Sequence, residues 1–139
     1  MATAAARRKI YAFGGGVAEA YRYEPRADRW ERIAGLPWPQ QWAWAAAWRG
    51  RYVIIPGGSI APEKLGEIAQ GTRIDANGFS AEVLVFDIQT QKYWRSEALP
   101  AGIIDYGLVL EGDRIFLAGG EDRGRHRQSW LMIGKLSLR

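Results

Sequence analysis

Short apolar runs alternate with polar turns along this chain, and this pattern predicts strands. The first four strands are expected at residues 2–6, 10–13, 20–23 and 30–33, bounded by glycine, proline or charged residues. Many short segments of this kind predict an all-β protein with antiparallel strands. One helical turn is expected outside the pattern, within residues 62–69.

Three segments that end in Gly-Gly repeat one pattern. They read "ATAAARRKIYAFGG" ending at Gly15, "AAAWRGRYVIIPGG" ending at Gly58 and "GLVLEGDRIFLAGG" ending at Gly120. Each holds a small or apolar strand, a polar turn and an apolar run. A sharp turn at the end of the second strand explains the glycines, because positive φ costs glycine little. The chain is therefore expected to consist of repeated units.

A second shared module follows the first two double glycines. It reads "AYRYEPRADRWERI" in one unit and "VLVFDIQTQKYWRS" in the next. Both have an aromatic-ended strand, an acidic residue, a turn and a further aromatic residue. Tyr23 and Trp30 therefore correspond to Phe86 and Tyr93, and each unit is expected to be a four-stranded antiparallel sheet.

The segment "WAWAAAW" at residues 42–48 fits either a strand or a helix by spacing alone. The repeat favours a strand, the first of the second unit, because turns bracket the segment. A strand would place the tryptophans on one face and the alanines on the other. The alanines would let a neighbouring sheet approach closely. The tryptophans would pack between units, or Trp42 would stack on a ligand.

These motifs resemble the kelch repeat, whose units are the blades of a β-propeller. The resemblance implies blades at about residues 2–33, 41–96 and 106–138 of a single domain, with a long insertion at 59–80. The third unit ends at its third strand, "SWLMIGKLSLR", without an outer fourth. Propellers typically use 4–8 blades, and an open stack would expose two apolar faces. The chain is therefore expected to be part of a longer propeller or to pair with a second copy as a six-bladed ring.

Composition and charge exclude several classes of protein. The 139 residues contain no cysteine, 47% hydrophobic and 24% charged residues, as in a globular domain without disulfides or thiolate metal sites. No apolar run is long enough to span a bilayer, and "MATAAARRKIYAFGGG" lacks the form of a signal peptide. The net charge is +4 and the pI about 9.6, but the arginines are scattered through turns that also carry acids. Neither a nucleic acid nor a membrane is therefore expected as a partner.

Within the kelch class, residues 86–136 resemble consecutive blades of the bacterial sialic-acid mutarotases, also called N-acetylneuraminate epimerases. The stretch "GGEDRGRHR" is similar to that family's Gly-Glu followed six residues later by arginine. The resemblance implies that Glu121 is the acid/base, that Arg127 is its neighbouring arginine, and that no cofactor or metal is needed. It also implies a periplasmic or secreted protein of carbohydrate metabolism, an isomerase. The insertion "SIAPEKLGEIAQGTRIDANGFS" matches a long excursion of the family.

The chemistry of sugar ring opening suits these residue types. A carboxylate at a strand end can move a proton from the anomeric hydroxyl to the ring oxygen. An arginine can bind the carboxylate of an acidic sugar bidentately. Arg125, His126 and Arg73 are further candidates for binding the substrate, beside Trp42 for its apolar part.

Each of these residues also has a purely structural interpretation. Glu121 could be a solvated turn acid, and "RGRHR" a solvated loop. His126 is the only histidine, so one chain cannot form a histidine-based metal cluster. A non-catalytic kelch module that binds a protein or glycan on its loops, or a self-assembling half-propeller, remain alternatives to the enzyme, since a fold alone does not decide function.

Overall fold

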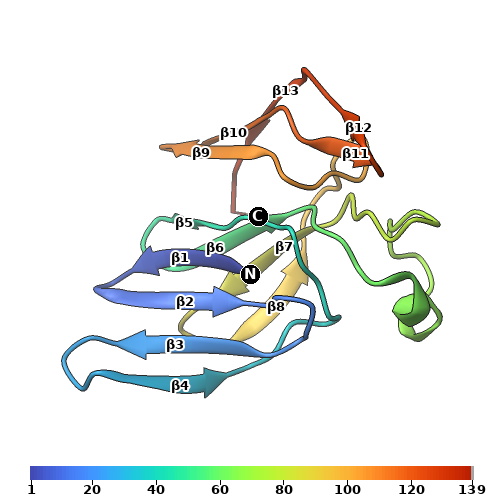
Figure 1. Cartoon of the computed structure of the whole chain (residues 1–139). Coiled ribbons are helices and arrows are strands. Elements are labelled where there is room, and N and C mark those ends of the chain that lie inside the picture. The colour runs from blue at the N-terminus through green and yellow to red at the C-terminus, as the bar shows by residue number, and fades with distance from the viewer. Residues whose placement is uncertain (139) are drawn as a thin grey trace.

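The computed structural model describes residues 1–138, which form three antiparallel sheets stacked in chain order (Figure 1). The first sheet has four strands in the order β1-β2-β3-β4. These strands are β1 (Ala2–Ala6), β2 (Lys9–Phe13), β3 (Ala20–Glu24) and β4 (Arg29–Ile33). They lie within one residue of the predicted boundaries, so the repeat pattern identified this sheet correctly.

The second and third sheets repeat this arrangement with two differences. The second sheet contains β5 (Ala46–Trp48), β6 (Tyr52–Pro56), β7 (Val83–Asp87) and β8 (Lys92–Arg95). The third contains β9 (Gly107–Glu111), β10 (Arg114–Ala118) and β13 (Leu131–Lys135). A separate hairpin of β11 (Glu121–Arg123) and β12 (His126–Arg127) lies between β10 and β13. Within residues 1–138, the third sheet has no fourth strand.

The prediction of a strand over residues 42–48 is wrong for its first four residues. Only Ala46–Trp48 is a strand, and Trp42 has a left-handed backbone with φ of 58°. The Trp42 carbonyl accepts a hydrogen bond from the Asp105 amide of another unit, at 3.4 Å. Because a left-handed residue interrupts the alternation of a strand, the tryptophans do not share a face: Trp48 is buried, whereas Trp42 and Trp44 are each 53% exposed.

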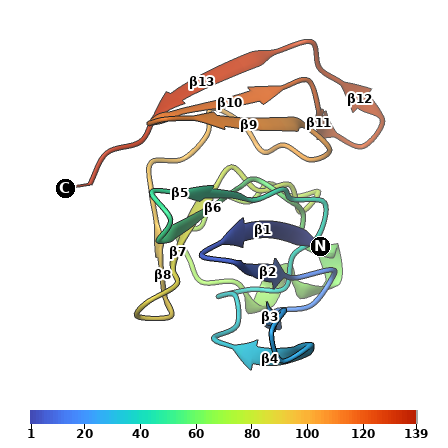
Figure 2. The ribbon, with the colours of Figure 1, turned by 90° about the vertical axis from the view of Figure 1, so that its left-hand side faces the viewer.

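The alanine half of that prediction is confirmed. Ala43 is buried, and Ala45 and Ala47 are partly buried, in the apolar core between the first and second sheets. The alanines of β1 face them, so the two strands pack closely. The first strands of the three sheets, β1, β5 and β9, lie side by side at the centre of the stack (Figures 1 and 2).

Two apolar cores join the sheets. Between the first and second sheets, Phe13 meets Phe86 edge to face at a centroid distance of 5.3 Å, and Tyr93 packs on Phe86 at 4.7 Å. Between the second and third sheets, Trp48 and Ile54 pack with Ile115 and Leu117. The second sheet therefore contributes one face to each core, whereas the first and third sheets contribute one face each.

The double glycines fasten neighbouring sheets together. Gly57 and Gly58 have φ of 65° and 93°, and the other two pairs have nearly the same values. A Cβ on Gly57 would collide with the Ile103 carbonyl, which accepts a hydrogen bond from the Gly58 amide at 2.9 Å. The Gly15 amide bonds to the Gln40 carbonyl in the same way, also at 2.9 Å. Glycine is thus required both for its conformation and for the close approach of the next unit.

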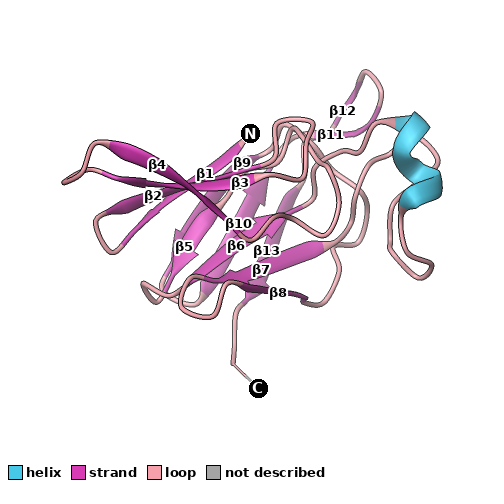
Figure 3. Cartoon of the chain, turned by 90° about the horizontal axis from the view of Figure 1, so that it is seen from below, coloured by secondary structure: helices cyan, strands magenta, loops and turns pink. Residues whose placement is uncertain are grey.

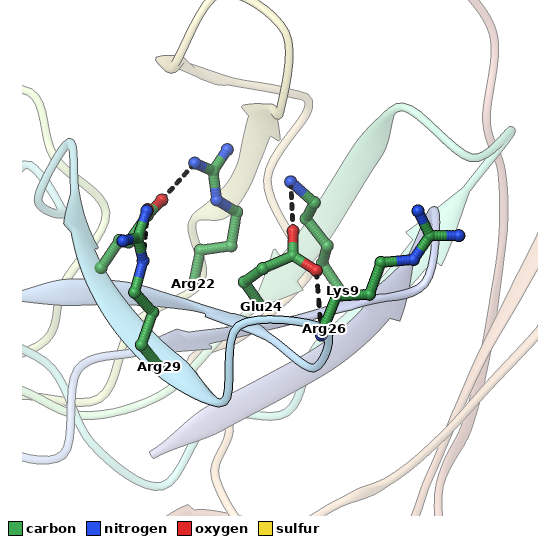
Figure 4. A network of polar contacts seen from close by, with 6 residues as sticks. Lys9, Arg22, Glu24, Arg26 and Arg29 are labelled. Carbon is green, nitrogen blue, oxygen red and sulfur yellow. Dashed lines mark hydrogen bonds and ion pairs between the residues drawn. The ribbon is translucent and has the colours of Figure 1, made fainter.

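Charged residues of β2, β3 and β4 pair with one another on the first sheet (Figure 4). Lys9 and Glu24 form an ion pair at 2.8 Å, and the Glu24 carboxylate also accepts a hydrogen bond from the Arg26 amide. Arg22 and Arg29 both donate to Glu31. These contacts hold the pKa values of Glu24 and Glu31 below their ordinary values, chiefly through hydrogen bonds from Lys9 and Arg22.

The insertion of the second sheet contains the short 3₁₀ helix η1 (Pro62–Glu67), which confirms the expected helical turn. This helix and the β11–β12 hairpin project from the same side of the molecule (Figures 1 and 3). No helix within residues 1–138 combines the length and apolarity needed to cross a bilayer.

Candidate functional site

The β11–β12 hairpin begins directly after the third double glycine. Glu121 pairs with Arg127 across the hairpin, and Arg125 takes a left-handed conformation in its turn. The Glu121 backbone also exchanges two hydrogen bonds with Ile104, at 2.9 and 3.0 Å, in the segment that leads into β9. These backbone contacts fix Glu121 at the start of β11.

Both carboxylate oxygens of Glu121 have partners in the same hairpin. Oε1 accepts a hydrogen bond from the Arg125 amide at 2.6 Å, and Oε2 lies 3.5 Å from Nε of Arg127. The Glu121 side chain is only 12% exposed, whereas that of Arg127 is 72% exposed. The structure thus joins Glu121 and Arg127, with a nearly covered carboxylate and an arginine that solvent reaches.

The adjacent acid, Asp122, organises the rest of the hairpin. Its oxygens lie 2.6 Å from Nδ1 of His126 and 2.6 Å from Nε2 of Gln128. The hydrogen bond with His126 is the main cause that lowers the pKa of the Asp122 carboxyl. His126 therefore contacts Asp122 and not Glu121, while the guanidinium of the turn residue Arg125 is left exposed.

A hollow of about 320 Å³ lies next to the backbone segment that pairs with Glu121. It is lined by Met1, Gly15, Gln41, Trp42, Ala43, Trp44 and Asp105. Because Asp105 follows Ile104, the partner of Glu121, the hollow and the hairpin share one backbone segment. Trp42 thus lies where an apolar group of a ligand could stack, in the same hollow as Asp105.

Asp105 was not among the site residues predicted from the sequence. It occupies in the third unit the place of Trp42 in the second, and both have left-handed backbones, with φ of 52° and 58°. The repeat could have found it, because the bridge Ile104–Glu121 matches the bridge Gln41–Ser59 in the unit before. Two non-glycine residues in this strained region line one hollow, and backbone strain of this kind clusters at functional sites.

Buried Tyr106 fixes the segment around Asp105. Its hydroxyl donates to the Pro56 carbonyl and accepts from the Trp44 amide. Burial raises the pKa of Tyr106 far above its ordinary value, so the hydroxyl stays protonated and both bonds persist. Trp44 and Asp105 are thereby held at the hollow by the same side chain.

Arg73 is not brought to this hairpin. Its side chain is exposed in the insertion, and its amide donates to Oε1 of buried Glu82 at 2.7 Å. In the described part of the chain, no hydrogen bond or ion pair joins Arg73 to Glu121 or Arg127. Its expected role in binding the substrate stays a prediction.

The donor set of the hairpin suits an anion more than a cation. Arg123, Arg125 and Arg127 lie exposed within five residues of one another. Residues 1–138 contain no cluster of three histidine or acidic side chains that could hold a metal ion. The hairpin offers a covered carboxylate and exposed arginines, which can bind a small polar molecule that bears negative charge. The hollow offers aromatic surface.

No protein-family model matches the chain, and no curated protein matches it. A solved structure described as "Structure of YjhT" is similar, with a TM-score of 0.78 and 18% sequence identity. The similarity covers 97% of this chain and 50% of that one, so the chain spans about half the length of the solved protein. At this identity the likeness shows the fold: an all-β protein built from the antiparallel blades of a kelch-type β-propeller.

Proposed function

We propose that this protein interconverts the anomers of an acidic or acylated sugar such as N-acetylneuraminate. The observation that carries the proposal is the nearly covered Glu121 carboxylate, 3.5 Å from an exposed arginine and one backbone segment away from an aromatic-lined hollow. The resemblance of "GGEDRGRHR" to the mutarotase motif supports the same assignment.

The reaction needs one group that takes a proton and then gives one. The Glu121 carboxylate removes the proton of the anomeric hydroxyl while the bond from the anomeric carbon to the ring oxygen breaks. The protonated Glu121 carboxyl then gives that proton to the ring oxygen, which leaves an open-chain ketone and restores the carboxylate. Rotation about the adjacent carbon–carbon bond and closure on the other face give the second anomer. Electrons and protons balance without a redox or metal cofactor.

The exposed arginines supply the affinity for an acidic sugar. Arg127 presents its guanidinium to solvent next to Glu121, and Arg125 extends the positive charge along the turn. A guanidinium matches the planar geometry of a sugar carboxylate. Trp42 and Trp44 offer apolar surface to the sugar face or its acyl group.

A second candidate, a sugar-binding module without catalysis, is favoured by one observation. Both oxygens of Glu121 already have partners in their own hairpin, the Arg125 amide and the Arg127 guanidinium. In that case the arginines and tryptophans bind the sugar, and Glu121 only braces the hairpin.

Exchange between the two anomers of N-acetylneuraminate, followed by proton NMR, separates the two functions. We expect the protein to accelerate exchange over buffer and Glu121→Gln to slow it by about 10²–10⁴-fold. Arg127→Ala should chiefly weaken binding. The matched control is Glu97→Gln, the same change at an exposed acid outside the hairpin. Sugar binding without any acceleration by the wild-type protein would leave the binding module, and neither binding nor acceleration would refute both candidates.

A further inference from the structure

Two faces of the stack have no partner within residues 1–138. One lies on the first sheet and carries Ile10, Tyr23 and Trp30, which are neighbours across β2, β3 and β4. The other lies on the third sheet and carries Val109, Phe116 and Ile133, which are neighbours across β9, β10 and β13. Trp30 is 53% exposed, Val109 is 61% exposed and Ile133 is 62% exposed. We call these rows the first open face and the third open face.

Each open face matches a face that is buried in the second sheet. The first open face corresponds in register to a row of the second sheet formed by Val53, Phe86 and Tyr93. This row packs on the first sheet. In both sheets the aromatic pair is tilted at nearly the same angle, 38° for Phe86–Tyr93 and 41° for Tyr23–Trp30. The first open face therefore has the form of a face that packs on a preceding sheet.

The third open face is the complementary half. In the second sheet, Ala46, Ile54 and Val85 pair in the register of Val109, Phe116 and Ile133. Ile54 and Val85 are buried in the core with the third sheet. Phe116 also holds the place of Tyr11, whose ring lies 6.4 Å from that of Phe86. Phe116 would thus meet Tyr23 of a first open face as Tyr11 meets Phe86.

Charges at the rim support the same pairing. Between the second and third sheets, Trp48 donates to Asp113 at 2.8 Å, and Arg49 pairs with Asp113 at 3.1 Å. In the third sheet Glu111 holds the place of Trp48, as the last residue before the first hairpin turn. In the first sheet Arg8 holds the place of Asp113, directly before β2. Glu111 and Arg8 have opposite charge, and both are exposed.

We propose that the third open face binds the first open face of a second copy of this chain, so that two copies close one ring. A twofold axis then relates two identical contacts, each between the third sheet of one copy and the first sheet of the other, and no open face is left. The size agrees, since this chain covers half of the solved propeller. The inference does not rest on the sugar reaction.

The first test is the solution mass of the 139-residue chain by light scattering at micromolar concentration. We expect one species of twice the 15.6 kDa chain mass. A folded species of 15.6 kDa, or a series of growing aggregates, would overturn the proposal and leave these faces to further sheets of a longer protein.

The second test separates head-to-tail closure from other dimers. Val109→Asp alters only the third open face and Trp30→Ser only the first. Each should weaken the dimer by at least about 30-fold, as at other interface hot spots. Trp44→Ser is the matched control, because Trp44 is equally exposed but lies in the hollow. Circular dichroism would show that the monomeric variants remain folded.

Mixing the two variants gives the sharpest result. In a dimer of one copy of each variant, one of the two contacts carries both changes and the other is unchanged. This mixed dimer should therefore form at protein concentrations at which neither variant dimerises alone. If Val109→Asp breaks the dimer and Trp30→Ser does not, the third sheets pair with each other and the proposal is wrong. Glu111→Arg or Arg8→Glu alone should weaken the dimer by up to about fivefold, because each change places two like charges together. A chain that carries both changes should dimerise as strongly as the wild type.

Discussion

The aromatic pairs Phe86–Tyr93 and Tyr23–Trp30 have the same local structure and opposite surroundings. Both join adjacent strands, with centroid distances of 4.7 and 5.1 Å. Phe86 is fully buried against the first sheet, whereas Trp30 is 53% exposed. The comparison teaches that the repeat specifies the aromatic pair within one sheet. How much the pair contributes to the free energy of unfolding depends on whether a neighbouring sheet covers it.

Ion pairs at equivalent positions also differ in exposure between the second and first sheets. Asp87 in the second sheet is buried and accepts two hydrogen bonds from Arg51, at 3.1 and 2.7 Å. Glu24, its counterpart in the first sheet, pairs with Lys9 at 2.8 Å with more of its side chain exposed. One motif position therefore holds a covered acid in one unit and a more exposed acid in the other.

The largest expected difference comes from removing one ring of each aromatic pair. Phe86→Ala should lower the free energy of unfolding by about 3–5 kcal/mol, because it empties a filled core. Tyr23→Ala should cost clearly less, since that ring faces no sheet formed by residues 1–138. Urea unfolding of both variants measures the difference, in a Val109→Asp background that keeps the chain monomeric. Equal losses would mean that the open face is as tightly packed as the core.

A smaller contrast is expected between two glycines with similar backbones. Gly57 and Gly112 have φ of 65° and 57°, but only Gly57 has the Ile103 carbonyl where a Cβ would stand. Gly112→Ala should cost about 1–2 kcal/mol through its left-handed backbone alone. Gly57→Ala should cost about 2–4 kcal/mol, because the contact with the next unit is lost as well. Thermal unfolding of both variants tests this, and equal costs would show that the close approach contributes nothing.

The smallest effect concerns the buried acid and its pH dependence. Hydrogen bonds from Arg51 are the main cause that lowers the pKa of Asp87 to about 2. Because the pKa is below its unfolded value, the stabilisation is complete above about pH 4 and is lost as the pH falls toward 2. Asp87→Asn should remove about 1–2 kcal/mol at pH 7 and flatten the profile between pH 4 and 2. Glu24→Gln, the matched change, should alter it less; an unchanged profile in Asp87→Asn would contradict the assignment.

The sequence by itself determined the sheets and their equivalence. The double glycines, the turn residues and the recurring aromatics are local signals, because φ preferences and strand alternation act over a few residues. They were enough to place β1 to β4 within one residue and to match Tyr23 and Trp30 with Phe86 and Tyr93.

Only the tertiary structure decided how the candidate site is assembled. Trp42 leaves the strand because segments of different units exchange hydrogen bonds around it, and Asp105 reaches the hollow for the same reason. Glu121 is covered because its own hairpin folds back to supply Arg125 and Arg127. Such contacts join residues whose proximity depends on how whole sheets stack, and no local pattern of hydrophobic and polar positions encodes that stacking.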